Sequence, residues 1–139
     1  MLGGDKIKVL LIMDIIAEFS VTNDLFGEDN TFQINPKNFA ITSIMQYDFP
    51  IENVEEFDLI FLHARSGNKA IDDGEFIETV CKEKTNLQSL IIWDESGNHG
   101  FGQLKRIKML SNVVTVNNLA EAANYLLSCN TCSPEVIRV

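Results

Sequence analysis

The stretch Ile7-Lys8-Val9-Leu10-Leu11-Ile12-Met13 is a short apolar run that ends at Asp14. Its continuity predicts a β-strand that is buried on both faces, as in a parallel sheet covered by helices. Similar short runs recur along the chain and are separated by polar or helix-forming segments. The sequence therefore predicts five strands, at Ile7–Met13, Phe39–Ile44, Asp58–His63, Leu90–Trp93 and Val113–Val116.

Helices are predicted between these strands. Asn118 is followed three residues later by Glu121, which is the spacing of a capping box at the start of a helix. Strands that alternate with helices favour parallel pairing and right-handed crossovers. The predicted fold is thus α/β, a single three-layer sandwich, with helical segments at Ile15–Phe26, Phe49–Phe57, Glu75–Lys84, Phe101–Leu110 and Leu119–Leu127.

Composition narrows the class of protein. The chain has 139 residues, of which 45% are hydrophobic and 22% charged, and this is typical of one globular domain. A formal net charge of −9 argues against nucleic acid and anionic membranes as partners. No apolar run approaches the roughly 20 residues of a membrane span, and no signal peptide is recognisable. We expect a cytoplasmic location, with residues 1–128 as the domain and 129–139 as an irregular tail or the start of a linker.

Polar residues stand where the predicted strands end. Ligands of open parallel sheets bind beyond the carboxyl ends of the strands. These ends meet at one edge of the sheet, so a ligand-binding or catalytic site is expected there. The candidate site residues are Asp14, His63, Asp94 and Asn117.

Four segments carry a likeness to a known family. They are Lys8–Asp14, Phe57–His63, Asp72-Asp73-Gly74 and Leu90–Asp94. Together they resemble the corresponding parts of a response-regulator receiver domain, the phosphoacceptor module of two-component signalling. The resemblance covers roughly residues 6–128 and implies a five-stranded parallel sheet in the order 2-1-3-4-5. Flavodoxin-like domains share this alternation of short apolar strands with helices.

This sequence differs from the family at the positions that carry out phosphoryl chemistry in receivers. Met13 stands in place of one of two paired acids, His63 in place of the phosphorylated Asp, and Asp94 in place of a Thr or Ser. Val116 or Asn117 replaces the Lys that ends the fifth strand in receivers. Magnesium prefers several hard oxygen ligands, which these residues do not supply. The resemblance therefore predicts a degenerate pseudo-receiver without catalysis, metal or cofactor, and without the family's usual phosphorylation.

Such a domain is expected to act through protein contacts. In receivers the face formed by the fourth helix, fifth strand and last helix commonly carries pairing, which points to a protein partner or a homodimer at Phe101–Leu110, Val113–Val116 and Leu119–Leu127. The alternative is a flavodoxin-like domain that binds a nucleotide or flavin over Asp14, His63 and Asp94. A hydrolase or phosphotransferase with a rearranged site is a third possibility.

Two smaller features stay open at this point. His63 is a packed histidine, a residue that senses pH or contacts a ligand, or a residue that is itself phosphorylated, since imidazole titrates near neutrality. Cys129 and Cys132 form a Cys-x-x-Cys after the last predicted helix. A redox pair is normally placed at the start of a helix, so these cysteines are either without a role or bind zinc together with a partner chain.

Overall fold

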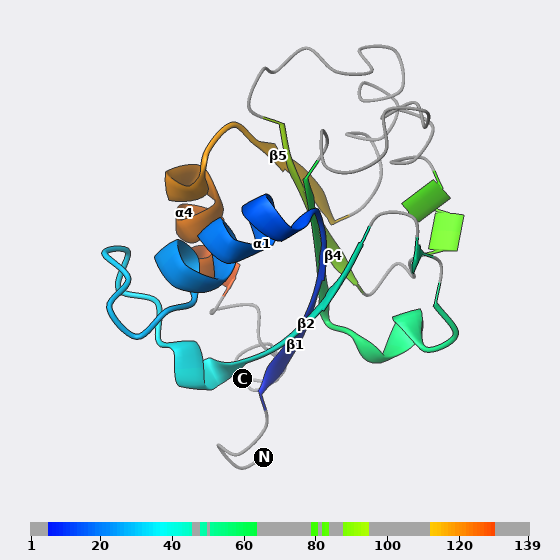
Figure 1. Cartoon of the computed structure of the whole chain (residues 1–139), viewed down its shortest axis with the longest axis horizontal. Coiled ribbons are helices and arrows are strands. Elements are labelled where there is room, and N and C mark those ends of the chain that lie inside the picture. Colours follow the sequence, from blue (N-terminus) through cyan, green and yellow to red (C-terminus); the bar gives the residue numbers. More distant parts are fainter. Residues whose placement is uncertain are drawn as a thin grey trace.

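The computed structural model describes residues 6–45, 48–49, 51–63, 79–80, 82–83, 88–94 and 112–129. All strand pairs in it are parallel. The sheet has the order β2-β1-β3-β4-β5, which confirms the predicted fold class and strand order (Figure 1). The strands are β1 (Ile7–Ile12), β2 (Phe39–Ile44), β3 (Leu59–His63), β4 (Ser89–Trp93) and β5 (Val113–Val116).

β1 is a central strand, as its apolar sequence predicts. It pairs with β2 on one side and with β3 on the other. Val9 and Leu11 belong to the core cluster on one face of the sheet, whereas Leu10 and Ile12 belong to the cluster on the opposite face. All four side chains are fully buried. A strand with two buried faces has no polar side to expose, and this explains why the run is almost continuously apolar.

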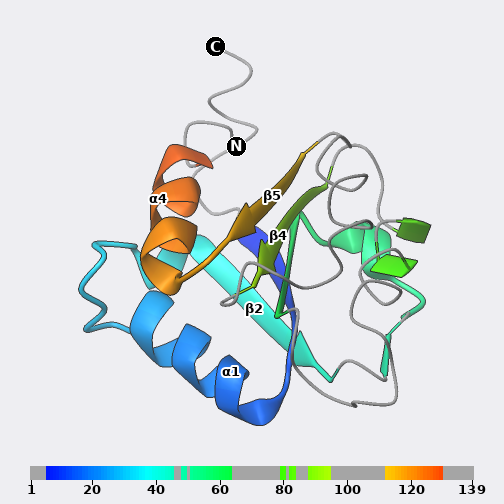
Figure 2. The same cartoon turned by 90° about the horizontal axis from the view of Figure 1, so that it is seen from above.

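Helical elements cover both faces of the sheet. α1 (Ile15–Ser20), the π-helix Val21–Leu25 and α4 (Leu119–Cys129) lie on one face, and Figure 2 shows α1 and α4 there together. The opposite core cluster includes Val54, from the 3-10 helix Val54–Glu56, and Val80. A second 3-10 helix, Pro36–Asn38, leads into β2.

The segment predicted as one helix at Ile15–Phe26 is helical, but it changes type at Val21. A π-helix has wider turns and is found mostly as a single turn attached to an α-helix. Here Thr22 Oγ1 donates to the carbonyl of Glu18 at 2.9 Å, and Asn23 Nδ2 donates to the carbonyl of Phe19 at 2.9 Å. These side-chain bonds satisfy carbonyl groups within the segment where the helix changes type.

The start of α4 confirms the predicted cap with one difference. Asn118 Oδ1 accepts from the backbone N–H of Glu121 at 2.9 Å. The Glu121 carboxylate accepts from the backbone N–H of Asn117 at 2.7 Å, one residue before the cap. The helix continues to Cys129 instead of ending at Leu127.

The helix predicted at Phe49–Phe57 is wrong in extent, since among the described residues of this range only Val54–Glu56 is helical, and as a 3-10 turn. Buried Gln88 explains the short turn. Its Nε2 donates to the carbonyls of Val54 and Phe57, at 2.6 and 2.7 Å. Those carbonyls are thus satisfied by a side chain without a longer helix.

Several predictions concern residues outside the described part of the chain. These are the helix Phe101–Leu110, the segment Asp72-Asp73-Gly74, Cys132 and most of Glu75–Lys84, of which 79–80 and 82–83 are helical. Within the described residues, no helix has the length and apolar character needed to cross a membrane.

Candidate functional site

The carboxyl ends of four neighbouring strands meet at one edge of the sheet. β3 ends at His63, which pairs with Trp93 at the end of β4. The backbone N–H of Asp94 donates to the carbonyl of Val116 at 2.8 Å and joins the ends of β4 and β5. The fold thus places all four predicted site residues at this edge, as the sequence predicts: Asp14, His63, Asp94 and Asn117.

Asp14 has a structural role at this edge, as the cap of a helix. Its Oδ1 accepts from the backbone N–H of Ala17 at 2.8 Å and caps α1. The residue before it, Met13, is buried in the core cluster that faces α1. Met13 therefore belongs to the core, and the Asp14 carboxylate holds the start of a helix.

His63 packs against the indole ring of Trp93. The two ring centroids are 4.4 Å apart, with the planes tilted by 40°. Trp93 is buried and also meets Phe61 edge to face, with the centroids 6.4 Å apart. Aromatic rings at such distances attract one another beyond the area they bury. This contact favours the interpretation of His63 as a packed histidine.

Asp94 and Asn117 have opposite surroundings. Asp94 has an exposed fraction of 0%, whereas Asn117 is exposed and its backbone N–H is bound by Glu121. A fully buried carboxyl group cannot meet a ligand from solvent without movement of the residues around it. Among the residues that the structure describes, no three His, Cys, Asp or Glu side chains are grouped as a metal site requires.

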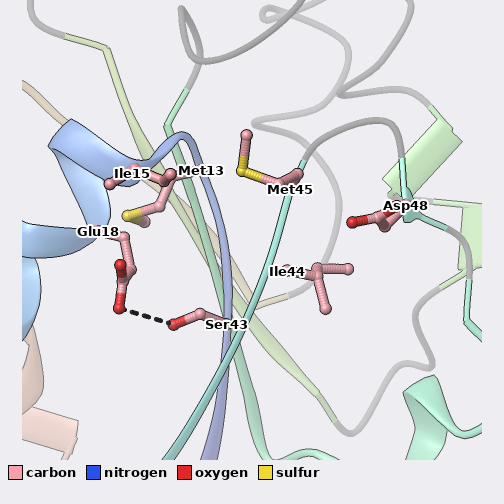
Figure 3. A pocket seen from close by; sticks show the side chains of 7 residues that line it. All are labelled: Met13, Ile15, Glu18, Ser43, Ile44, Met45 and Asp48. Atoms are coloured by element: carbon pink, nitrogen blue, oxygen red, sulfur yellow. Dashed lines mark hydrogen bonds between the residues drawn. The ribbon is translucent and has the colours of Figure 1, made fainter.

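A pocket of about 310 Å³ opens beside this edge, between α1 and the end of β2 (Figure 3). Glu18 and Asp48 are its charged residues, and Glu18 Oε2 accepts from the Ser43 hydroxyl at 3.4 Å. Sequence reasoning missed this pocket. The available signal was the polar residue Ser43 near the end of β2, together with Glu18, an acid one turn into the helix that follows β1. The lining consists of Met13, Ile15, Glu18, Ser43, Ile44, Met45 and Asp48.

A second pocket, of about 340 Å³, lies near the start of α4. Five of its seven lining residues are polar, and the full lining is Asn23, Asp24, Asp29, Asn30, Thr31, Phe32 and Leu119. Asn30 is already engaged, since its amide donates to the carbonyls of Gly27 and Ile34. Neither pocket includes Asp14, His63, Asp94 or Asn117 in its lining.

Comparisons with known proteins show that this chain is similar in fold to a solved structure. No family model matches the chain, and no curated protein matches it. Among solved structures, the response regulator RcsB of Salmonella typhimurium is similar, with a TM-score of 0.59 and 14% sequence identity. The chain has a receiver-like fold. The match covers 96% of this chain but 65% of RcsB, whose structure was described for its conformational dynamism in DNA interaction.

Proposed function

We propose that this chain is a receiver-like regulatory domain that acts through protein contacts and is not phosphorylated in the way receivers are. It would carry out no catalysis of its own. The proposal builds on the receiver-like fold and on the residues at the carboxyl edge of the sheet.

The observation that carries the proposal is the packing of His63 on Trp93, with ring centroids 4.4 Å apart. By the resemblance to receivers, His63 occupies the position of the phosphorylated aspartate. An imidazole stacked on a buried indole is neither an aspartate nucleophile nor a magnesium ligand of the hard oxygen type.

The surrounding residues support the same conclusion. The Asp14 carboxylate caps α1, and Asp94 is fully buried. The sequence contains no Lys after Lys108, so β5 is not followed by the ammonium group that receivers place on the phosphoryl oxygens. Phosphoryl transfer depends on such positioned positive charge.

The test is phosphoryl uptake by the His63→Asp variant. The protein is incubated with acetyl phosphate and Mg²⁺, and its intact mass is measured. We expect no added phosphoryl group, because the variant restores the aspartate but neither the ammonium group nor a free pair of carboxylates. His63→Asn, which has nearly the same shape without the charge, is the matched control.

Uptake by His63→Asp and not by His63→Asn would overturn the proposal. An intact receiver domain treated in parallel establishes that the reagent is active. Phosphoryl uptake by the unmodified chain at this edge of the sheet would overturn the proposal as well.

We propose protein contacts for the face that includes β5 and α4. β5 is an edge strand, and its backbone can pair with another strand. Leu127 on α4 is 43% exposed. The predicted helix Phe101–Leu110 would complete this face but lies outside the described residues.

A further inference from the structure

β2 forms one outer edge of the sheet, and its outer side is open. Within the part of the chain that the structure describes, β2 pairs with β1 alone. Thr42 and Ser43 on this strand are exposed. An edge strand presents a row of N–H and C=O groups that lack a neighbouring strand, and these groups can pair with a strand of another chain.

The pairing with β1 shows which backbone groups of β2 point outward. The backbone N–H of Met13 donates to the carbonyl of Ile44 at 3.2 Å, so Ile44 faces β1. Alternate residues of a strand face the same neighbour, and Thr42 therefore faces β1 as well. Ile41 and Ser43 instead direct their N–H and C=O groups away from the sheet.

β2 lacks the features that usually protect an edge strand. Such strands are commonly short, or carry a Lys, a Pro or a bulge. The six residues of Phe39–Ile44 include no charged residue and no Pro, and they pair with β1 one to one, without a bulge. β5, at the opposite edge, has only four residues. β2 is thus the longer of the two edges and is free to pair.

The two ends of β2 carry opposite charges. Lys37 lies in the 3-10 helix before the strand and is exposed. Asp48 is exposed and follows the strand, and Glu18 accepts from Ser43 near the same end (Figure 3). Two β2 strands in antiparallel order place the basic end of each beside the acidic end of the other, which is favourable. A two-fold axis perpendicular to the sheet produces this order between two copies of one chain.

We propose that the chain forms a homodimer in which β2 pairs antiparallel with β2 of a second copy. The backbone groups of Ile41 and Ser43 supply the new hydrogen bonds, and the Lys37 end of each strand lies beside the Asp48 end of the other. The result is one continuous sheet across both copies. The contact lies at the opposite edge from β5, so it goes beyond the proposed function.

The open donors fix the register of this pairing. With the two-fold axis at Thr42, Ile41 of each copy lies opposite Ser43 of the other, and each N–H meets a carbonyl. An axis at Ile41 would instead place Ser43 opposite Phe39, whose N–H already donates to the carbonyl of Pro36. The axis at Thr42 therefore satisfies more of the outward groups.

Sedimentation velocity of the full chain at rising concentration measures the dissociation constant of the dimer. Thr42→Lys sets two Lys side chains opposite each other at the axis and should raise this constant about tenfold or more. Ser43→Pro removes one outward N–H from each copy and should raise it about tenfold, while an outward Pro is tolerated on an edge strand. Ser43→Ala keeps the N–H and should stay within about twofold of the unmodified chain. Circular dichroism checks that each variant is folded.

A charge exchange tests the antiparallel order. Lys37→Glu and Asp48→Lys should each weaken the dimer, because each sets like charges together at both ends of the paired strands. The double variant re-forms the pair with its charges exchanged and should recover most of the affinity. Glu55→Lys makes the same change in net charge at an exposed site away from β2 and is the matched control.

A cysteine at the axis tests the register. In the proposed dimer Thr42 lies opposite Thr42 of the second copy as a non-hydrogen-bonded pair, with Cα atoms about 4.5 Å apart. A disulfide spans this distance. Mild oxidation of Thr42→Cys should therefore give a covalent dimer. Glu55→Cys should give no more than the background of the unmodified chain, which has three Cys.

Four results would overturn the inference. One is a chain that stays monomeric at every concentration, and another is a dimer that withstands both Thr42→Lys and Ser43→Pro. The third is no cross-linking of Thr42→Cys above the control. The fourth is a dimer lost in Leu127→Ser but kept in Thr42→Lys, which would place self-association on α4 and leave the proposed function standing.

Discussion

α1 and α4 cover the same face of the sheet, but they are buried to very different extents. α4 has eleven residues and turns Ala122, Ala123 and Leu126 into the core. α1 has six residues and buries only Ala17. Most helical stability in proteins comes from packing of an apolar face. α4 is therefore held mainly by the domain itself, whereas α1 directs most of its apolar surface to the outside.

The apolar residues of the two helices therefore have different surroundings. In α4 they stabilise the fold, whereas in α1 Ile15, Ile16 and Phe19 stay exposed. The π-helix after α1 supports the division, because Val21 and Leu25 anchor the segment to the core. The domain can thus hold α1 in place while its outer face stays exposed.

The largest expected effect is a difference in the free energy of unfolding between a variant in α4 and a variant in α1. Leu126→Ala should lower the free energy of unfolding by about 2–4 kcal/mol, because it opens a cavity in the core. Ile16→Ala should change it by less than about 0.5 kcal/mol, as for most surface substitutions. Urea unfolding measures both values. A loss for Ile16→Ala as large as for Leu126→Ala would mean that Ile16 is buried.

A smaller effect concerns the two helix caps. Asp14→Ala and Asn118→Ala each remove a side-chain oxygen that accepts a backbone N–H, and each should cost about 1 kcal/mol. Asp14→Asn keeps an oxygen acceptor and should be nearly neutral. Thermal unfolding of the three variants checks this. If Asp14→Asn destabilised the fold as much as Asp14→Ala, the charge of Asp14 would matter more than its capping.

The smallest expected change in stability concerns the acid in the first turn of each helix, Glu121 in α4 and Glu18 in α1. Glu121 accepts from a backbone N–H beside the positive end of α4, and Glu121→Gln should cost about 0.3–1 kcal/mol. The Glu18 carboxylate accepts from the Ser43 hydroxyl at the longer distance of 3.4 Å, so Glu18→Gln should cost less. Urea unfolding at low and high salt separates the two. Equal losses would show that Glu18 stabilises the fold as much as Glu121 does.

The strands were the most predictable part of the molecule. β2 and β5 have the predicted bounds, and the other three differ by one residue at one end. The reason is physical, since a strand buried on both faces must be apolar throughout. The four site residues were correctly placed at one edge, because parallel strands bring their carboxyl ends together.

The roles of those residues were less predictable. Whether Asp14 caps a helix or faces a ligand depends on where α1 begins, which periodicity does not fix to one residue. The contact between His63 and Trp93 depends on the register of β3 against β4. The exposure of Ile16 depends on which stripe of α1 meets the core, and its apolar neighbours allow more than one.

The central claim is that the carboxyl edge of this sheet has no working phosphoryl site. An amide NMR titration with Mg²⁺, followed by Mg²⁺ with beryllofluoride as a mimic of the phosphoryl group, tests it most directly. We predict no specific shifts at Asp14, His63 or Asp94. Saturable shifts that centre on these residues and extend into β4 and β5 would contradict the claim and reveal a rearranged phosphoryl site.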